Sequence, residues 1–196
     1  HQAGNQMWNR PYNRAGYFNL FNRNKRDLVL DLSKPRGREL FLKMVDDADI
    51  VLENNSARVF AQFGLTYETL AERNPRIIMC SISGFGATGP ERDYVAYGSN
   101  VEASSGLVSQ LGYGEGLPFG TGSYYADPIA GTHATAGIVA ALIQREVTGR
   151  GANVEMALQE SGMSFNLEAL MDYQLSGRVA GPMNNRSRRI APQGAY

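Results

Sequence analysis

One acid in the sequence has the position and the neighbours of a nucleophile. Asp127 lies in the run YYADP at 124–128 and comes directly before a long apolar stretch, so its position is that of a helix N-cap. A carboxylate at the start of a helix is expected to stay ionised and can attack an activated acyl group. Position alone fits a purely structural cap at least as well, so both roles stay open here.

The residue types that the common catalytic and metal sites need are nearly absent. The sequence has two histidines, so a histidine-rich metal site is excluded, and a Ser-His-Asp triad would have to use His133. The single cysteine, Cys80, lies in an apolar run, where filling the core is its ordinary role. GxSxG, P-loop and HExxH motifs do not occur. We therefore expect no metal site.

The composition indicates a folded protein with no general affinity for polyanions. Of 196 residues, 43% are hydrophobic, which is enough for a buried core in one domain or a large part of one. Lys and Arg total 19 and so do Asp and Glu, a balance that supports neither a nucleic-acid partner nor a membrane-surface partner. The sequence shows no secretory segment and no apolar run of about 18 residues, so we expect a soluble, cytoplasmic protein.

Apolar runs typical of strands alternate along the sequence with stretches of helical periodicity, and both predict the elements that position Asp127. Strands alternating with helices indicate an α/β fold with a parallel, doubly wound sheet. The glycine-rich stretches 84–90 and 112–122 read as loops, and Asn54-Asn55-Ser56 reads as a loop with N-cap chemistry. The expected strands are 27–32, 49–53, 76–83 and 153–158. One helix is expected to start at Lys34-Pro35, and four more are expected over 67–73, 99–111, 127–148 and 159–176.

An ordered set of short motifs resembles the family III CoA-transferases (the CaiB/BaiF family). From about Asn22 to Tyr196 the runs follow one another as NRNKR (22–26), LDL (30–32), DIVLEN (49–54), SISGFG (81–86), TGP (88–90), SGL (105–107), AD (126–127) and TGRG (148–151). The resemblance implies a Rossmann-like parallel sheet flanked by helices. It also implies that 1–196 is a partial large domain of an interlocked dimer, without its first strand–helix unit and its small domain. Residues 184–196 would start the connection toward that small domain.

The same resemblance assigns the chemistry. Family members use an aspartate that attacks an acyl-CoA and passes through a mixed anhydride to an aspartyl-CoA thioester, and Asp127 falls on that position. It implies coenzyme A as substrate and product, an acyl-CoA and a carboxylic acid as partners, and no metal. It places CoA along three segments: Leu30, Asp31, Leu32, Ser33 and Lys34, then Asn54, Asn55 and Ser56, and finally Tyr94, Val95, Ala96 and Tyr97.

Some positions differ from the usual family pattern. Ser33 replaces a lysine and Asn55 replaces a phenylalanine. Gly98 stands where many members carry an acid, and Glu102 stands where glutamine is usual. These differences concern the CoA contacts and the acyl specificity.

Two other functions remain as alternatives. A 2-methylacyl-CoA racemase moves a proton between a histidine and an aspartate on opposite faces of the substrate. Its histidine would match the region 97–99, which has none, and His133 follows Asp127 by about one and a half turns of the same expected helix. A non-catalytic CoA-binding relative would use the same crevice, although it would be free to lose Asp127. We expect an interlocked homodimer at full length, and we expect that residues 1–196 alone are not a self-sufficient catalyst.

Overall fold

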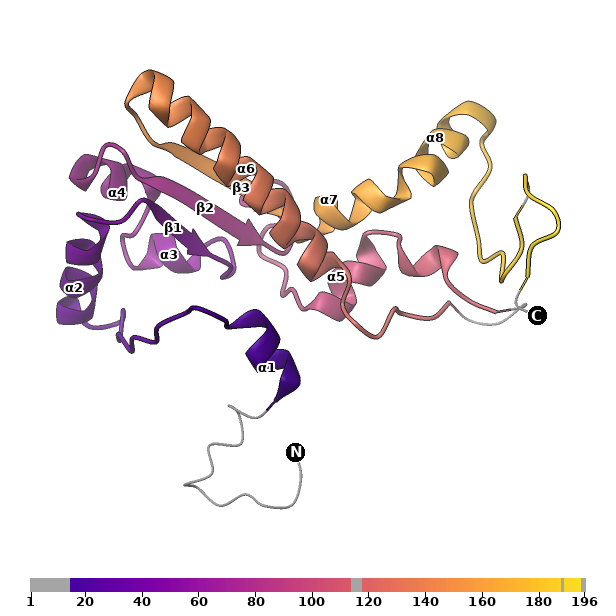
Figure 1. Cartoon of the computed structure of the whole chain (residues 1–196), viewed down its shortest axis with the longest axis horizontal. Coiled ribbons are helices and arrows are strands. Elements are labelled where there is room, and N and C mark those ends of the chain that lie inside the picture. Colours follow the sequence, from indigo (N-terminus) through magenta and orange to yellow (C-terminus); the bar gives the residue numbers. More distant parts are fainter. Residues whose placement is uncertain (1–14, 114–117, 188, 195–196) are drawn as a thin grey trace, which may run out of the picture. The chain divides into compact units, whose positions relative to one another are not determined.

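The computed structural model describes residues 15–113, 118–187 and 189–194 (Figure 1). The chain divides into two units, residues 1–31 and 32–196. The described part of the first unit holds α1 (Gly16–Phe21) and an irregular segment after it. The strand predicted at 27–32 is wrong, because no strand of the described residues pairs with this segment and Val29 is 94% exposed. A strand needs a hydrogen-bonded neighbour, and local β-propensity cannot supply one.

The second unit is built on a three-stranded parallel sheet in the order β1-β2-β3. Its strands are β1 (Ile50–Glu53), β2 (Ile78–Ser83) and β3 (Ala152–Ala157). Ile78 of β2 lies opposite Ile50 on one side and Ala152 on the other. The central strand is almost wholly buried, as its near-continuous apolar run indicates. These three strands and their parallel arrangement confirm the predicted α/β fold.

Helices cover both faces of the sheet (Figure 1). On one face, α2 (Pro35–Val45) and α4 (Tyr67–Arg73) pack around a core that includes Leu70 and Met79, with the short α3 (Val59–Gln62) beside it. On the other face lies α6 (Ala126–Thr148), whose Ala130 and Ala134 pack against Cys80 and Ile82. Successive residues of a strand point to opposite faces, so Met79 and Cys80 enter different cores.

Several helix boundaries follow local signals in the sequence. Pro35 occupies the first turn of α2, and the Thr66 side chain accepts a hydrogen bond from the Thr69 amide at the start of α4. Gly149 ends α6 in the left-handed conformation, at φ 72°. By length and composition alone α6 is apolar enough to cross a membrane, but Ala141 and the alanines named above are buried within the protein.

Two predicted helices are interrupted. The stretch 99–111 forms α5 (Gly98–Ser104) and the 3-10 turn η3 (Val108–Gln110), separated by Gly106 at φ 83°. The stretch 159–176 forms α7 (Leu158–Met163), η4 (Ser164–Asn166) and α8 (Leu167–Ser176). Buried Asn166 joins the two breaks: its Nδ2 donates to the Ser105 carbonyl at 2.8 Å, and its Oδ1 accepts from Gln110 Nε2. Helical periodicity does not report such a side-chain bridge.

Buried Arg145 fastens the carboxyl end of α6 to the amino-terminal edge of the sheet. Its guanidinium donates to Asp49 Oδ1 at 2.9 Å, to the Asp49 carbonyl at 3.3 Å and to the Arg76 carbonyl at 3.2 Å. Gly151 closes the same edge, since its amide donates to the Pro75 carbonyl at 2.9 Å and a Cβ there would meet the Ile77 carbonyl oxygen at 1.7 Å. The start of α6 is thereby directed to the carboxyl edge of the sheet.

Candidate active site

A cavity of about 360 Å³ opens where β1 and β2 end and α6 begins. The crevice at the carboxyl ends of parallel strands is the usual ligand site of an open α/β sheet. Its wall contains Asp127 and most of two predicted CoA segments, namely Asn54, Asn55 and Ser56 after β1, and Tyr94, Ala96 and Tyr97 before α5. Residues distant in the sequence therefore meet at one cavity.

The other residues predicted to contact CoA are Val95 and the segment 30–34. Val95 is not part of the cavity wall. Leu30 and Asp31 belong to the first unit of the chain, and their role in binding CoA stays a prediction. Leu32, Ser33 and Lys34 belong to the second unit but do not line this cavity. The Leu32 and Ser33 carbonyls accept hydrogen bonds from the Arg38 guanidinium, at 3.0 and 3.1 Å.

The loop after β1 is shaped by Glu53 rather than by a helix cap. The Asn55 amide donates to Glu53 Oε2 at 2.8 Å, and Asn55 Nδ2 donates to the same oxygen at 3.1 Å. The next helix, α3, has Arg58 at its N-cap with no side-chain cap bond. The N-cap chemistry predicted for Asn54-Asn55-Ser56 is therefore wrong. None of these three residues caps α3, and Asn55 instead donates to Glu53 at the end of β1.

Asp127 is the second residue of α6 and not its N-cap, which corrects the position predicted from the sequence. Tyr125 holds the cap position, without a side-chain cap bond, and the Asp127 amide donates to the Tyr124 carbonyl at 3.0 Å. Among the described residues no donor forms a hydrogen bond with the Asp127 carboxylate. The carboxylate is consequently free to meet a ligand rather than occupied in holding the helix.

The environment of Asp127 raises its pKa above the ordinary aspartate value. Burial is the larger cause, and the negative charge of Glu102 adds to it. A position in the first turn of a helix acts in the opposite direction. Burial and the like charge of Glu102 therefore act against the helix terminus, and the net effect on the pKa of Asp127 is an increase.

Gly98 lets α5 approach the acid closely. A Cβ built at Gly98 would lie 2.7 Å from Asp127 Oδ2 and 2.6 Å from Tyr124 Cβ, so a side chain has no room there. The preceding segment is held by Asn100, whose Oδ1 accepts from the Tyr97 amide at 2.7 Å and whose Nδ2 donates to the Val95 carbonyl at 2.8 Å. The sequence signal was the glycine itself.

Two further polar residues of the wall were missed by the sequence reasoning. Ser83, the last residue of β2, is 4% exposed, and its Oγ has no hydrogen-bond partner in the structure. An unsatisfied buried hydroxyl is costly, and a ligand in the cavity can satisfy it. Arg92 brings a positive charge to the wall while pairing with Asp93 at 3.5 Å. No local pattern marks either residue, although Ser83 belongs to the SISGFG motif.

His133 lines a different cavity, of about 270 Å³, with Tyr125, Ile129 and Phe165 among its wall residues. In the described part of the chain no histidine lines the cavity of Asp127. A histidine base opposite Asp127, which the racemase alternative requires, is thus not present among these residues.

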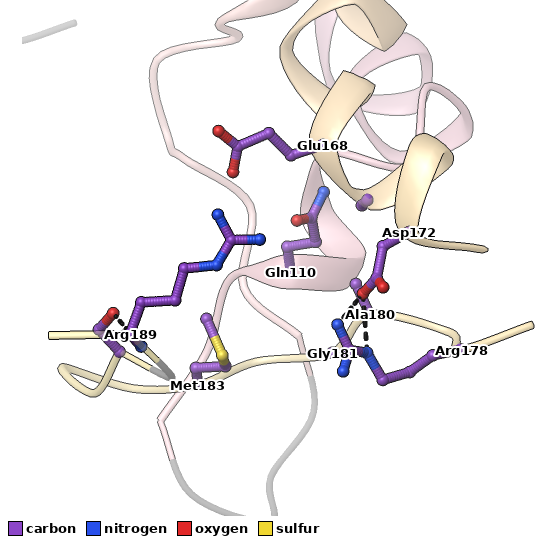
Figure 2. Close-up of a pocket in the computed structure, with 10 residues that line it drawn as sticks. Gln110, Glu168, Asp172, Arg178, Ala180, Gly181, Met183 and Arg189 are labelled. Carbon is purple, nitrogen blue, oxygen red and sulfur yellow. Dashed lines mark hydrogen bonds and ion pairs between the residues drawn. The ribbon is translucent and has the colours of Figure 1, made fainter. Parts of the chain in front are cut away.

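A polar cavity of about 220 Å³ is formed by α8, Gln110 and the segment after α8 (Figure 2). Asp172 and Arg178 form an ion pair in it, and Arg189 extends toward Glu168. None of the residues predicted to contact CoA contributes to this wall. Over the described ranges no group of three or more metal-ligating side chains is found.

Known proteins share sequence similarity with most of this chain. The family model for CoA-transferase family III matches residues 3–196. The chain belongs to CoA-transferase family III. It is 38% identical over 178 residues to a succinate–glutarate CoA-transferase of Agrobacterium fabrum, covering 91% of this chain and 44% of that protein. It is 38% identical over 177 residues to an acetyl-CoA:oxalate CoA-transferase of Acetobacter aceti, covering 90% and 46%.

Structural similarity leads to the same family. A CaiB/BaiF family protein from Brucella suis superposes with a TM-score of 0.81 at 34% identity, covering 86% of this chain and 44% of that one. The family III sheet and its flanking helices are thus shared. The chain spans less than half of the length of the relatives it matches.

Proposed function

We propose that this chain carries the nucleophile and part of the CoA site of an enzyme that moves CoA from an acyl-CoA thioester to a free carboxylic acid. The observation that carries the proposal is the cavity that Asp127 shares with two segments predicted to bind CoA, in a member of CoA-transferase family III. The names of two relatives, each a transferase between carboxylic acids, support this reaction class.

The proposed reaction proceeds on Asp127 in four balanced steps. The carboxylate attacks the thioester carbonyl and expels CoA thiolate, leaving a mixed anhydride. The thiolate attacks the Asp127 carbonyl, forms the aspartyl-CoA thioester and releases the donor acid as a carboxylate. The acceptor carboxylate attacks this thioester, forms a second anhydride and expels the thiolate again. The CoA thiolate then attacks the acceptor's carbonyl carbon in this second anhydride, which gives the new acyl-CoA and releases the Asp127 carboxylate.

The cavity wall supplies the groups that orient this substrate. Ser83 Oγ, which lacks a partner, donates a hydrogen bond to a carbonyl oxygen of the bound thioester. Arg92 provides a cation for an anionic part of the substrate. For the complete protein we propose a cytoplasmic, interlocked homodimer.

Mass spectrometry of the complete protein tests the role of Asp127. After incubation with acyl-CoA and treatment with hydroxylamine, we expect the modification on the peptide that contains Asp127. Asp127→Ala should abolish exchange between acids, and Asp47→Ala, at an exposed acid after α2, should not. Because Asp127 is not the N-cap, the variant should lose less free energy of unfolding than the roughly 1 kcal/mol typical of a lost cap. Retained turnover in Asp127→Ala would exclude the nucleophile role. Epimerisation of 2-methylacyl-CoA without exchange between acids would favour the racemase instead.

A further inference from the structure

Glu102 is a buried acid without a cationic partner. It lies in α5, is 2% exposed, and forms no ion pair with any Lys or Arg of the described residues. Its Oε1 accepts a hydrogen bond from the Thr121 amide at 3.2 Å. Burying a carboxylate with so little compensation costs free energy, so its presence needs a reason other than stability.

The hydrogen bond links α5 to the segment that leads into the nucleophile. Thr121 lies six positions before Asp127 in the sequence, in a segment, 118–125, that forms no helix or strand. Gly98, four residues before Glu102 on the same helix, packs directly against Asp127. Positions i and i+4 share a helix face, so Glu102 lies one turn behind the contact with Asp127.

We propose that Glu102 is a positioning residue for Asp127, which both anchors residues 118–125 and places a second negative charge beside the nucleophile. This inference rests on the proposed function. It assigns a use to a buried acid that the four reaction steps leave unexplained.

The charge has a chemical consequence. Repulsion from Glu102 adds to burial in raising the pKa of Asp127, and a more basic carboxylate is the stronger nucleophile. Acylation removes the charge of Asp127 and therefore relieves the repulsion. The other titratable groups around the acid are Arg92, Tyr94 and Tyr97 in the cavity wall and Tyr124 against Gly98, and Arg92 is paired with Asp93. Glu102 is thus the acid that acts on Asp127 through its charge.

Two substitutions separate the two parts of the role. Glu102→Gln keeps an oxygen that accepts from the Thr121 amide but removes the charge, whereas Glu102→Leu removes both. Glu155→Gln is the control, because Glu155 also accepts a backbone hydrogen bond, from the Ala87 amide at 2.7 Å, but its charge is not among the causes that raise the pKa of Asp127. A purely structural role of Glu102 would not change the titration of another residue.

The primary measurement is the pH dependence of carbodiimide labelling at Asp127 in the complete protein, quantified by mass spectrometry. Labelling requires the protonated acid, so its midpoint follows the pKa of Asp127. We expect the midpoint to move to lower pH in Glu102→Gln and in Glu102→Leu, and to stay in place in Glu155→Gln. An unchanged midpoint in both Glu102 variants, or an equal shift in the control, would overturn the inference.

Turnover supplies the second readout. The acid limb of the kcat/KM profile should move to lower pH in Glu102→Gln, and kcat should fall by a further factor of about 10 to 100 in Glu102→Leu, since the loop before the nucleophile is released. Equal kcat in the two variants would remove the anchoring role. If labelling shifts as expected but no variant or wild-type protein exchanges CoA between acids, the proposed function fails while the electrostatic link stands.

Discussion

Asp127 and Ser83 show how environment turns ordinary residues into candidates for chemistry. The acid has a raised pKa because it is partly desolvated and lies near a like charge. The hydroxyl of Ser83 is buried without a partner on the wall of the same cavity. Both features describe the surroundings of the side chain, which a residue's type and its sequence neighbours do not define.

Replacing Ser83 tests whether its hydroxyl serves a ligand. We expect Ser83→Ala to weaken binding of an acyl-CoA roughly fivefold, the equivalent of about 1 kcal/mol for one hydrogen bond. The free energy of unfolding should stay within about 1 kcal/mol of wild type or rise, because the hydroxyl has no partner to lose. Calorimetric titration and denaturant unfolding measure the two quantities. Ser81→Ala, on the same strand but outside this cavity wall, is the control, and equal affinity in the two variants would contradict the role.

At the scale of elements, the ends of the sheet strands form the site together with the start of α6, and α5 packs against Asp127. The carboxyl ends of β1 and β2 and the start of α6 converge because Arg145 fixes the opposite end of α6 to the sheet. The start of α5 then fits against Asp127 only because residue 98 has no side chain. Asp127 is therefore placed by packing between helices rather than by its own hydrogen bonds.

Gly98→Ala should disturb activity more than stability. The new Cβ would lie 2.7 Å from Asp127 Oδ2, so either α5 or the acid must move. We expect kcat/KM to fall about a hundredfold, while the free energy of unfolding falls by about 1 to 3 kcal/mol, as is typical of overpacking. Gly120→Ala is the matched control, because a Cβ there meets no atom within 4 Å. Wild-type turnover in a folded Gly98→Ala protein would show that the close approach is not needed for catalysis.

At the scale of the whole molecule, the second unit leaves apolar helix surface in solvent. Val139, Ile143 and Val147 follow one another at i+4 spacing along α6 and are 49%, 65% and 85% exposed. Such a stripe on a folded domain marks an interaction surface. Other residues of α6, Ala130 and Ala134, pack against the sheet, along which α6 runs in Figure 1.

We expect residues 1–196 to self-associate through this stripe and to show no CoA transfer alone. Sedimentation should report a species larger than one chain, and Ile143→Glu should shift it toward the monomer because a charge cannot be buried there without a partner. Gln144→Glu adds the same charge at the neighbouring exposed position and should leave association unchanged. A stable monomer of the 196-residue chain with full transfer activity would contradict this expectation.

The sequence alone determined the parallel sheet, the bounds of α4 and the acid on which the chemistry is proposed. Period-specific apolar patterns and caps such as Thr66 and Gly149 act within a few residues, so they can be read from a short window. The ordered motifs singled out Asp127 through resemblance, whereas its position alone left the cap role and the nucleophile role both open.

Only the tertiary structure decided which residues meet. It left 27–32 without a strand partner and bridged the breaks of two predicted helices through Asn166. It also placed the charge of Glu102 near Asp127, and it placed Ser83 on the wall of the cavity that Asp127 lines. The physical reason is that burial, strand pairing and electrostatic coupling depend on distances in space between residues far apart in the chain. Local propensity carries no information about those distances.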